Sequence, residues 1–172
     1  AIYSNVSVTS GSWNLMIAGS GAATPSSGSL GAFADGSYSV TASAHDTAGN
    51  SSSDSTSSEL LIDSRAVLIA ITGLDAGSDT GSSNSDRNTA DNTPTISGTS
   101  DQPNRLVRVT LNDGSTDYIF TATTDGSGSW SVTTDTLPDG SYTVSASITS
   151  PAGGTGTATL SGAPLVIDTT AP

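Results

Sequence analysis

The chain has 172 residues, no cysteine, and a formal net charge of -12 from 16 acidic residues against 4 arginines. This balance excludes disulfides and thiolate metal sites, and it argues against a nucleic-acid partner because phosphate binding depends on clustered Lys and Arg. No run approaches the roughly 18 apolar residues that a membrane span needs, so membrane insertion is not expected.

The acidic residues are almost all aspartate. Glu59 is the only glutamate, which leaves 16 − 1 = 15 aspartates, and Asp is favoured both in turns and in oxygen-ligated cation sites. The single histidine, His45, offers little to a zinc site. Hard cations are therefore the expected metals, and bound divalent ions would relieve the repulsion within such an acidic chain.

Strands are the elements that the residue pattern predicts. An apolar fraction of 33% would permit disorder, but apolar and polar residues alternate first at 38–42 and again at 107–111 and 142–146. No stretch shows the periodicity of an amphipathic helix. In the second half of the chain the expected strands lie near residues 66–72, 94–99, 105–111, 117–123, 129–134, 141–148 and 157–167, with a hairpin turn at Asn112-Asp113-Gly114.

An internal repeat organises the chain. The offsets between matching segments are 130 − 13 = 117, 139 − 35 = 104 and 168 − 63 = 105, so the repeat unit is about 104 residues, with a 13-residue insertion around residues 19–31 of the first copy. The matching segments are Gly11-Ser12-Trp13 with Gly128-Ser129-Trp130, residues 35–40 with 139–144, and residues 61–64 with 166–169.

A repeat of this length is a whole domain, and seven short strands in about 100 residues predict an immunoglobulin-like sandwich. The expected fold is all-β: tandem immunoglobulin-like antiparallel β-sandwiches with an incomplete first copy. Residues 1–64 hold only the C-terminal strands of a sandwich, residues 65–168 form a complete one, and residues 169–172 begin the linker to a next repeat.

The first copy lacks counterparts of residues 65–117, because Ile2 and Tyr3 align with Ile119 and Phe120. Two explanations stay open. The chain is an excerpt of a longer one, or strands from another molecule complete the half-sandwich, whose apolar face and strand edge would otherwise be exposed.

Three motifs resemble the immunoglobulin-like repeats of giant bacterial adhesins, including the type 1 secreted adhesins with RTX-type ends. Residues 79–99, DTGSSNSDRNTADNTPTISGT, look like the family segment D-T-G-x-S-x-S-D-x-x-T-x-D-x-T-P-T-x-S-G-T. The second motif is Gly128-Ser129-Trp130-Ser131-Val132 followed by residues 137–142, and the third is the linker-like end at residues 167–172. The segment Asp63-Ser64-Arg65 departs from the family linker by its arginine.

The resemblance implies calcium at the junctions between domains, and aspartate oxygens suit that ion. Asp63, in the junction between the copies, is expected to converge with Asp79, Asp86 and Asp91, and with Asp35 from the first copy. Asp139 and Asp168 are expected to form the equivalent half-site toward a following domain. Asp113 and Asp125 lie beside glycine-containing turns and are interpreted as turn residues.

The aromatic residues and the histidine are assigned structural roles. Trp13 and Trp130 each follow Gly-Ser at the start of an alternating strand and are expected to pack in cores. Tyr38 and Tyr142 follow Asp-Gly and are expected to be strand-start tyrosines of the corner type. His45-Asp46 is the nearest approach to a catalytic pair, but the second copy lacks it and there is no G-x-S-x-G motif, so no catalytic residue is predicted.

The expected function is a structural extender repeat of a secreted bacterial surface adhesin, which calcium stiffens at the domain junctions and which supports cell adhesion or biofilm formation. The expected location is extracellular, on the bacterial cell surface. The expected partners are neighbouring repeats of the same chain or of adjacent subunits, with a host or surface ligand bound through other domains. The alternatives are a filament subunit assembled by strand donation and a carbohydrate- or peptide-binding module.

Overall fold

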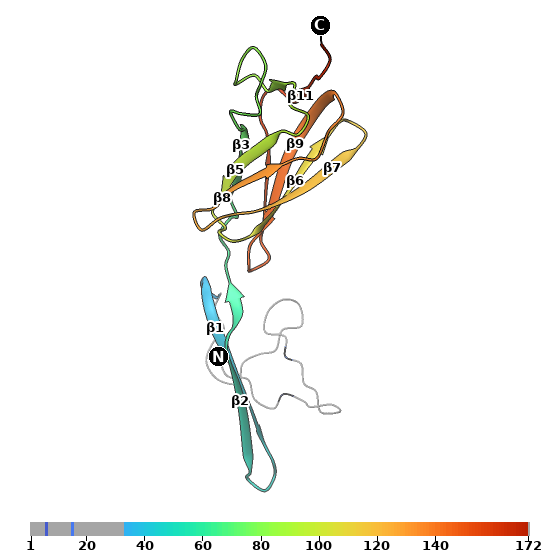
Figure 1. Ribbon diagram of the computed structural model, residues 1–172. Coiled ribbons are helices and arrows are strands. Elements are labelled where there is room, and N and C mark those ends of the chain that lie inside the picture. The colour runs from blue at the N-terminus through green and yellow to red at the C-terminus, as the bar shows by residue number, and fades with distance from the viewer. Residues whose placement is uncertain (1–5, 7–14, 16–32, 172) are drawn as a thin grey trace. The chain divides into compact units, whose positions relative to one another are not determined.

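The computed structural model describes residues 6, 15 and 33–171, and the chain divides into two units, Ala1–Ile62 and Asp63–Pro172 (Figure 1). Within the described ranges every regular element is a strand, and none of them contains a helix that is long and apolar enough to cross a membrane. The expected all-β fold is therefore confirmed. The expectations for Ile2, Tyr3, Trp13 and the insertion around residues 19–31 fall outside the described residues.

The described part of the first unit is an antiparallel hairpin of β1 (Gly36–His45) and β2 (Ser51–Ile62). The turn between the strands is organised by Asp46, whose carboxylate accepts hydrogen bonds from the Ala48 and Asn50 amides at 2.9 and 2.8 Å. His45 is the exposed last residue of β1, and its backbone continues the ladder opposite Ser51.

The second unit is a sandwich of two sheets in its described residues (Figure 1). One sheet has the order β3-β5-β8. The other has the order β4-β11-β9-β6-β7, with β10 also paired to β9. The strands are β3 (Ile69–Leu74), β4 (Asn88–Thr89), β5 (Thr95–Ser100), β6 (Leu106–Asn112), β7 (Asp117–Thr123), β8 (Ser129–Thr133), β9 (Gly140–Thr149), β10 (Thr155–Thr159) and β11 (Leu165–Ile167).

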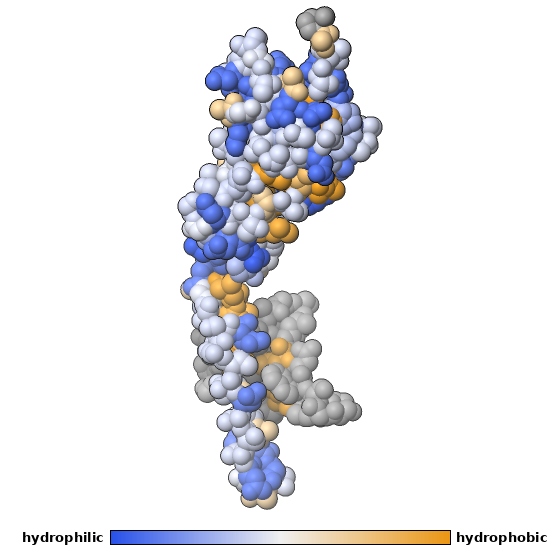
Figure 2. All heavy atoms as spheres, viewed as in Figure 1, coloured by the Kyte–Doolittle hydropathy of each residue, from blue (hydrophilic) through white to orange (hydrophobic). Residues whose placement is uncertain are grey.

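The core lies between these sheets, because alternate residues of each strand point inward. The expected core position of Trp130 is confirmed, since its side chain is buried. Figure 2 shows a mostly hydrophilic surface on this unit with a few apolar areas, and its exposed large apolar residues are Leu68, Leu106 and Ile119. The buried apolar residues are Ile96, Val107, Val109, Leu111, Trp130, Leu137, Tyr142, Val144, Ala146, Ile148, Leu165 and Ile167.

The hairpin of the first unit repeats the strand register of the second. Gly36 pairs with Ile62 as Gly140 pairs with Ile167, and Ala42 pairs with Asp54 as Ala146 pairs with Ala158. The tyrosines that follow Asp-Gly also behave alike. The Tyr38 hydroxyl donates to the Ala34 carbonyl at 2.8 Å, and the Tyr142 hydroxyl donates to the Pro138 carbonyl at 2.7 Å, which confirms the expected corner tyrosines.

Two features of the second unit differ from the sequence-based expectation. The single strand expected at 157–167 is two strands, β10 and β11, because the regular pairing with β9 ends at Thr159 and resumes at Leu165. The two-residue strand β4 was not expected. It forms because Val166 and Ile167 pair with it in parallel, a long-range contact that no local alternation signals.

Candidate functional site

Six of the seven predicted metal-binding aspartates belong to the second unit, and they lie at two separate ends of it. Asp63 precedes β3, whereas the loop that holds Asp79, Asp86 and Asp91 follows β3. The six residues of β3 separate these two ends by about 20 Å. The expected convergence of Asp63 with the three loop aspartates is therefore wrong, because an extended strand carries the chain to the opposite end of the sandwich before the loop begins.

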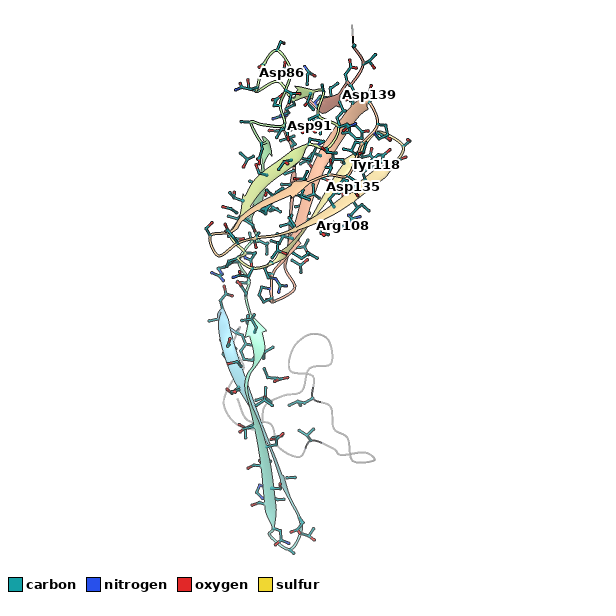
Figure 3. The ribbon with its side chains drawn as sticks, viewed as in Figure 1. Asp86, Asp91, Arg108, Tyr118, Asp135 and Asp139 are labelled. Atoms are coloured by element: carbon teal, nitrogen blue, oxygen red, sulfur yellow. The ribbon has the colours of Figure 1, made fainter. Side chains whose placement is uncertain are left out.

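The loop aspartates instead lie at the end of the sandwich from which the chain leaves. Strand β4, within the loop, pairs with β11, and the Asp168 amide donates to the Thr89 carbonyl at 2.9 Å. Figure 3 shows Asp86, Asp91 and Asp139 at this end, near the C-terminus. We call this region the outgoing end, comprising Asp79, Asp86, Asp91, Asp139 and Asp168.

Buried hydroxyl groups hold the loop 75–91 in shape. The Thr89 hydroxyl donates to the Ser78 carbonyl at 2.5 Å and accepts a hydrogen bond from the Asp91 amide at 2.9 Å. The Ser78 hydroxyl accepts from the Thr95 amide of β5 at 2.9 Å. Thr89 and Ser78 are 3% and 6% exposed, so these hydrogen bonds are shielded from competing water. They fix the loop to the sheet and so fix its aspartates.

Asp79 is the most unusual of these carboxylates. It is only 6% exposed, and its Oδ2 atom accepts a hydrogen bond from the Arg87 amide at 3.2 Å. Its Oδ1 atom is buried and has no hydrogen-bond partner among the described residues. A buried carboxylate oxygen without a partner is costly, and a bound cation is one way to compensate it.

Asp86 and Asp91 lie on the same loop and use one oxygen each to cap local turns. The Asp86 Oδ1 atom accepts from the Asn88 amide at 3.0 Å, and the Asp91 Oδ1 atom accepts from the Thr93 amide at 2.9 Å. Burial raises the pKa of Asp91, but hydrogen bonds from Thr93 and Ser78 outweigh burial and hold that pKa below its usual value. Asp91 is therefore ionised near neutral pH.

Asp139 clamps the outgoing linker to the end of the sandwich. Its Oδ1 atom accepts hydrogen bonds from the Thr169 amide at 3.1 Å and the Thr169 hydroxyl at 2.8 Å, and its Oδ2 atom accepts from the Thr170 hydroxyl at 3.1 Å. The Thr169 hydroxyl is the main cause of a lowered Asp139 pKa. Asp168 starts the linker, and its Oδ1 atom accepts from the Thr170 amide at 3.0 Å.

Asp63, at the start of the second unit, is arranged differently. Asp63 forms a two-pronged ion pair with Arg65, and this neighbour lowers the pKa of Asp63 to about 2. Asp35 belongs to the first unit, where it directly precedes β1.

Asp113 and Asp125 lie in turns as expected: the Asp113 carboxylate accepts from the Thr116 amide at 2.7 Å, and that of Asp125 from the Ser127 amide at 2.8 Å.

The outgoing end fits calcium in donor chemistry. All of its candidate donors are oxygens, and Asp79 has a buried carboxylate oxygen with no hydrogen bond. Within the part of the chain that the structure describes, however, no three Asp, Glu or His side chains gather closely enough to hold a metal ion. Asp79 would therefore be joined by hydroxyl, carbonyl or water oxygens together with at most one neighbouring carboxylate.

Two polar residues at structural positions were missed by the sequence argument. Asp101 accepts a hydrogen bond from the Leu68 amide at 3.0 Å and so ties the start of the second unit to the end of β5. Arg87 donates from Nη1 to the carbonyls of Ser161 and Ala163 at 2.7 and 2.6 Å. Both contacts join residues far apart in sequence, so no local pattern predicts them. Arg87 does lie within the motif at residues 79–99, but that motif does not indicate its partners.

Comparison with known proteins identifies the fold family. The model of the family described as "Bacterial Ig-like domain" matches residues 67–169, more than half of the chain, and the chain therefore belongs to the bacterial Ig-like domain family. A solved structure described as "Crystal structure of tetra-tandem repeat in extending region of large adhesion protein" is similar, with 31% sequence identity and a TM-score of 0.48. The alignment covers 80% of this chain and 33% of that structure's chain. Comparison with curated proteins found no match.

Proposed function

We propose that this chain is part of an array of immunoglobulin-like repeats that acts as a spacer in a secreted bacterial surface adhesin, and that calcium binds at the outgoing end of each complete repeat. The observation that carries the proposal is the repeated strand register. The pairing of β1 with β2 matches that of β9 with β10 and β11, so the same structural unit recurs in sequence within one chain. Tandem repetition is typical of proteins whose modules set a length.

The connection between the two copies supports a spacer role. Strand β2 ends at Ile62 and β3 begins at Ile69, so only residues 63–68 connect them. A linker this short allows little slack between successive modules. At the outgoing end the linker is held further, because Asp139 accepts hydrogen bonds from both Thr169 and Thr170.

Calcium is proposed for the outgoing end because of Asp79. This residue presents a buried carboxylate oxygen without a hydrogen bond, on a loop that also carries Asp86 and Asp91. Bound there, calcium would neutralise the Asp79 carboxylate and link parts of the loop through shared oxygen ligands. The chain's own hydrogen bonds, from Thr89 to Ser78 and from Arg87 to Asp79, hold the loop in place beside β11.

The partners that this function requires are neighbouring repeats, with adhesion to a host or other surface carried out by other domains. An extracellular location and a part in cell adhesion or biofilm formation follow from the same proposal. The face of the second unit that Figure 2 shows is mostly hydrophilic, which suits a module exposed to solvent.

Thermal unfolding of the 172-residue chain in EDTA and in millimolar calcium tests the proposal. Ligand that binds only the folded state at 100 times its dissociation constant stabilises by about 2.7 kcal/mol, so the melting temperature of the second unit should rise clearly. Asp79→Asn should abolish this rise. In EDTA the same variant should be as stable as the wild type or more stable, because it removes a buried charge.

Asp54→Asn is the matched control, because Asp54 lies exposed in β2 of the first unit. This variant should keep the full calcium response. An unchanged melting temperature of the wild type in calcium would remove the metal from the proposal. A calcium response that survives Asp79→Asn would place the ion elsewhere.

A further inference from the structure

The two linkers of this chain occupy equivalent positions in the repeat. Ile62 ends β2 opposite Gly36, and Ile167 ends β11 opposite Gly140, so the residue that follows each isoleucine is equivalent. Asp63 therefore corresponds to Asp168. By the same register Ser64 corresponds to Thr169, and Arg65 corresponds to Thr170.

Both linkers begin with the same local turn. The Arg65 amide donates to the Asp63 Oδ1 atom at 3.2 Å, and the Thr170 amide donates to the Asp168 Oδ1 atom at 3.0 Å. An aspartate that accepts from the amide two residues later forms an Asx turn. The backbone of the two linkers is thus alike, and the difference between them lies in the side chains.

The side chain at the third linker position acts differently in the two copies. In the outgoing linker the Thr170 hydroxyl donates to Asp139, which directly precedes β9. In the incoming linker Arg65 folds back onto its own Asp63: Nε lies 2.8 Å from Oδ1, and Nη2 lies 2.9 Å from Oδ2. Each oxygen of the Asp63 carboxylate therefore accepts a charge-assisted hydrogen bond from one guanidinium group.

This pairing competes with metal binding at Asp63. A calcium ion would have to replace both guanidinium hydrogen bonds and approach a fixed positive charge, and like charges at such short range repel. The lowered pKa of Asp63 shows the same stabilisation of its ionised form by Arg65. The equivalent Asp168 has a threonine in place of the arginine, so its linker contains no internal cation.

We propose that Arg65 takes the place of a metal ion in the incoming linker: it occupies Asp63 and keeps residues 63–66 ordered without calcium. Under this proposal Asp63 does not bind calcium, whereas the aspartates of the outgoing end remain free to do so. It goes beyond the proposed function, and depends on it only where the calcium response of Asp63 is compared with that of Asp79.

A measurement without calcium tests the proposal directly. Backbone 15N relaxation of the full 172-residue chain in EDTA should give residues 64–66 heteronuclear NOE values close to those of β3. Arg65→Thr, which reproduces the outgoing linker's residue, should lower these values while the β3 signals stay in place and report an intact fold. Arg65→Lys keeps the charge without the two-pronged geometry, and its values should lie between the two.

A calcium titration observed at the side-chain carboxyl carbons provides the second test. In the wild type the Asp63 carboxyl signal should not move in millimolar calcium, and in Arg65→Thr it should move. An Asp63 signal that shifts in the wild type with the same midpoint as Asp79 would overturn the proposal, as would equal ordering of residues 64–66 in EDTA with and without the arginine. If no carboxyl signal of any variant responds, calcium binding in the proposed function fails, and the EDTA comparison alone decides the role of Arg65.

Discussion

The indole ring of Trp130 lies directly over Gly98, its cross-strand neighbour in the β5–β8 pair. A methyl group at residue 98 would lie 2.3 Å from Trp130 Cζ2 and 2.1 Å from the Ala70 carbonyl oxygen. Glycine is therefore required here for close approach, and the tryptophan fills the space that a side chain would take. The indole ring thus fills the part of the core that faces the three-stranded sheet.

Gly98→Ala should destabilise the second unit by at least about 3 kcal/mol, the upper end for overpacking, because one of the clashing atoms belongs to a neighbouring backbone. Urea unfolding followed by circular dichroism measures the change. Gly126→Ala is the matched control, since no atom lies within 4 Å of the added carbon, and it should cost far less. Equal effects of the two changes would contradict the packing argument.

Tyr142→Phe should cost about 1 kcal/mol, because it removes the hydrogen bond to the Pro138 carbonyl and leaves the buried ring in place. Chemical denaturation of the second unit is the measurement. Tyr118→Phe provides the comparison. Its hydroxyl reaches the exposed Asp113 carboxylate only at 3.4 Å, and its loss should have little effect.

Arg87→Ala should free the segment between β10 and β11. The side chain holds this segment through the Ser161 and Ala163 carbonyls, and its loss should destabilise the unit by about 1–2 kcal/mol. Amide hydrogen exchange should rise first at Val166, whose amide donates to the Arg87 carbonyl. Arg108→Ala, which removes only a surface contact to Thr110, should leave exchange at Val166 unchanged.

Acid should weaken the second unit through its hydrogen-bonded aspartates. The Thr169 hydroxyl holds the Asp139 pKa below the usual 3.8. A carboxyl group whose folded pKa is lowered contributes stability that is present above its unfolded pKa and is lost as the pH falls through the folded value. The urea midpoint should therefore be flat from pH 7 to about 5 and fall below about pH 4.

Asp139→Asn should make this acid loss shallower, because the substituted side chain no longer titrates. Urea midpoints at neutral pH and at pH values below 4 would show the difference. An acid loss of the same steepness in Asp139→Asn and the wild type would mean that Asp139 contributes nothing to it.

Alternation of apolar and polar residues predicted most of the sandwich. The strands expected at 105–111, 117–123 and 141–148 appear as β6, β7 and β9 with shifts of one residue or less at their ends. These strands have one face in the core, so every second residue is buried and apolar, and the sequence alternates with a period of two. The break between β10 and β11 was missed although Gly162 and Pro164 mark it in the sequence; in the structure Arg87 also binds the backbone there, at Ser161 and Ala163.

The sequence alone determined the class of fold, the repeat and the corner tyrosines, because each of these depends on residue type and local spacing. Only the tertiary structure decided which aspartates meet. Asp63 and Asp79 are close in sequence but lie at opposite ends of β3, whereas Asp139 and Thr169 are 30 residues apart and hydrogen-bonded. An extended strand separates residues that are close in sequence, and pairing within a sheet brings together residues that are distant in sequence. The fold, and not the sequence spacing, therefore decides which aspartates lie at the outgoing end.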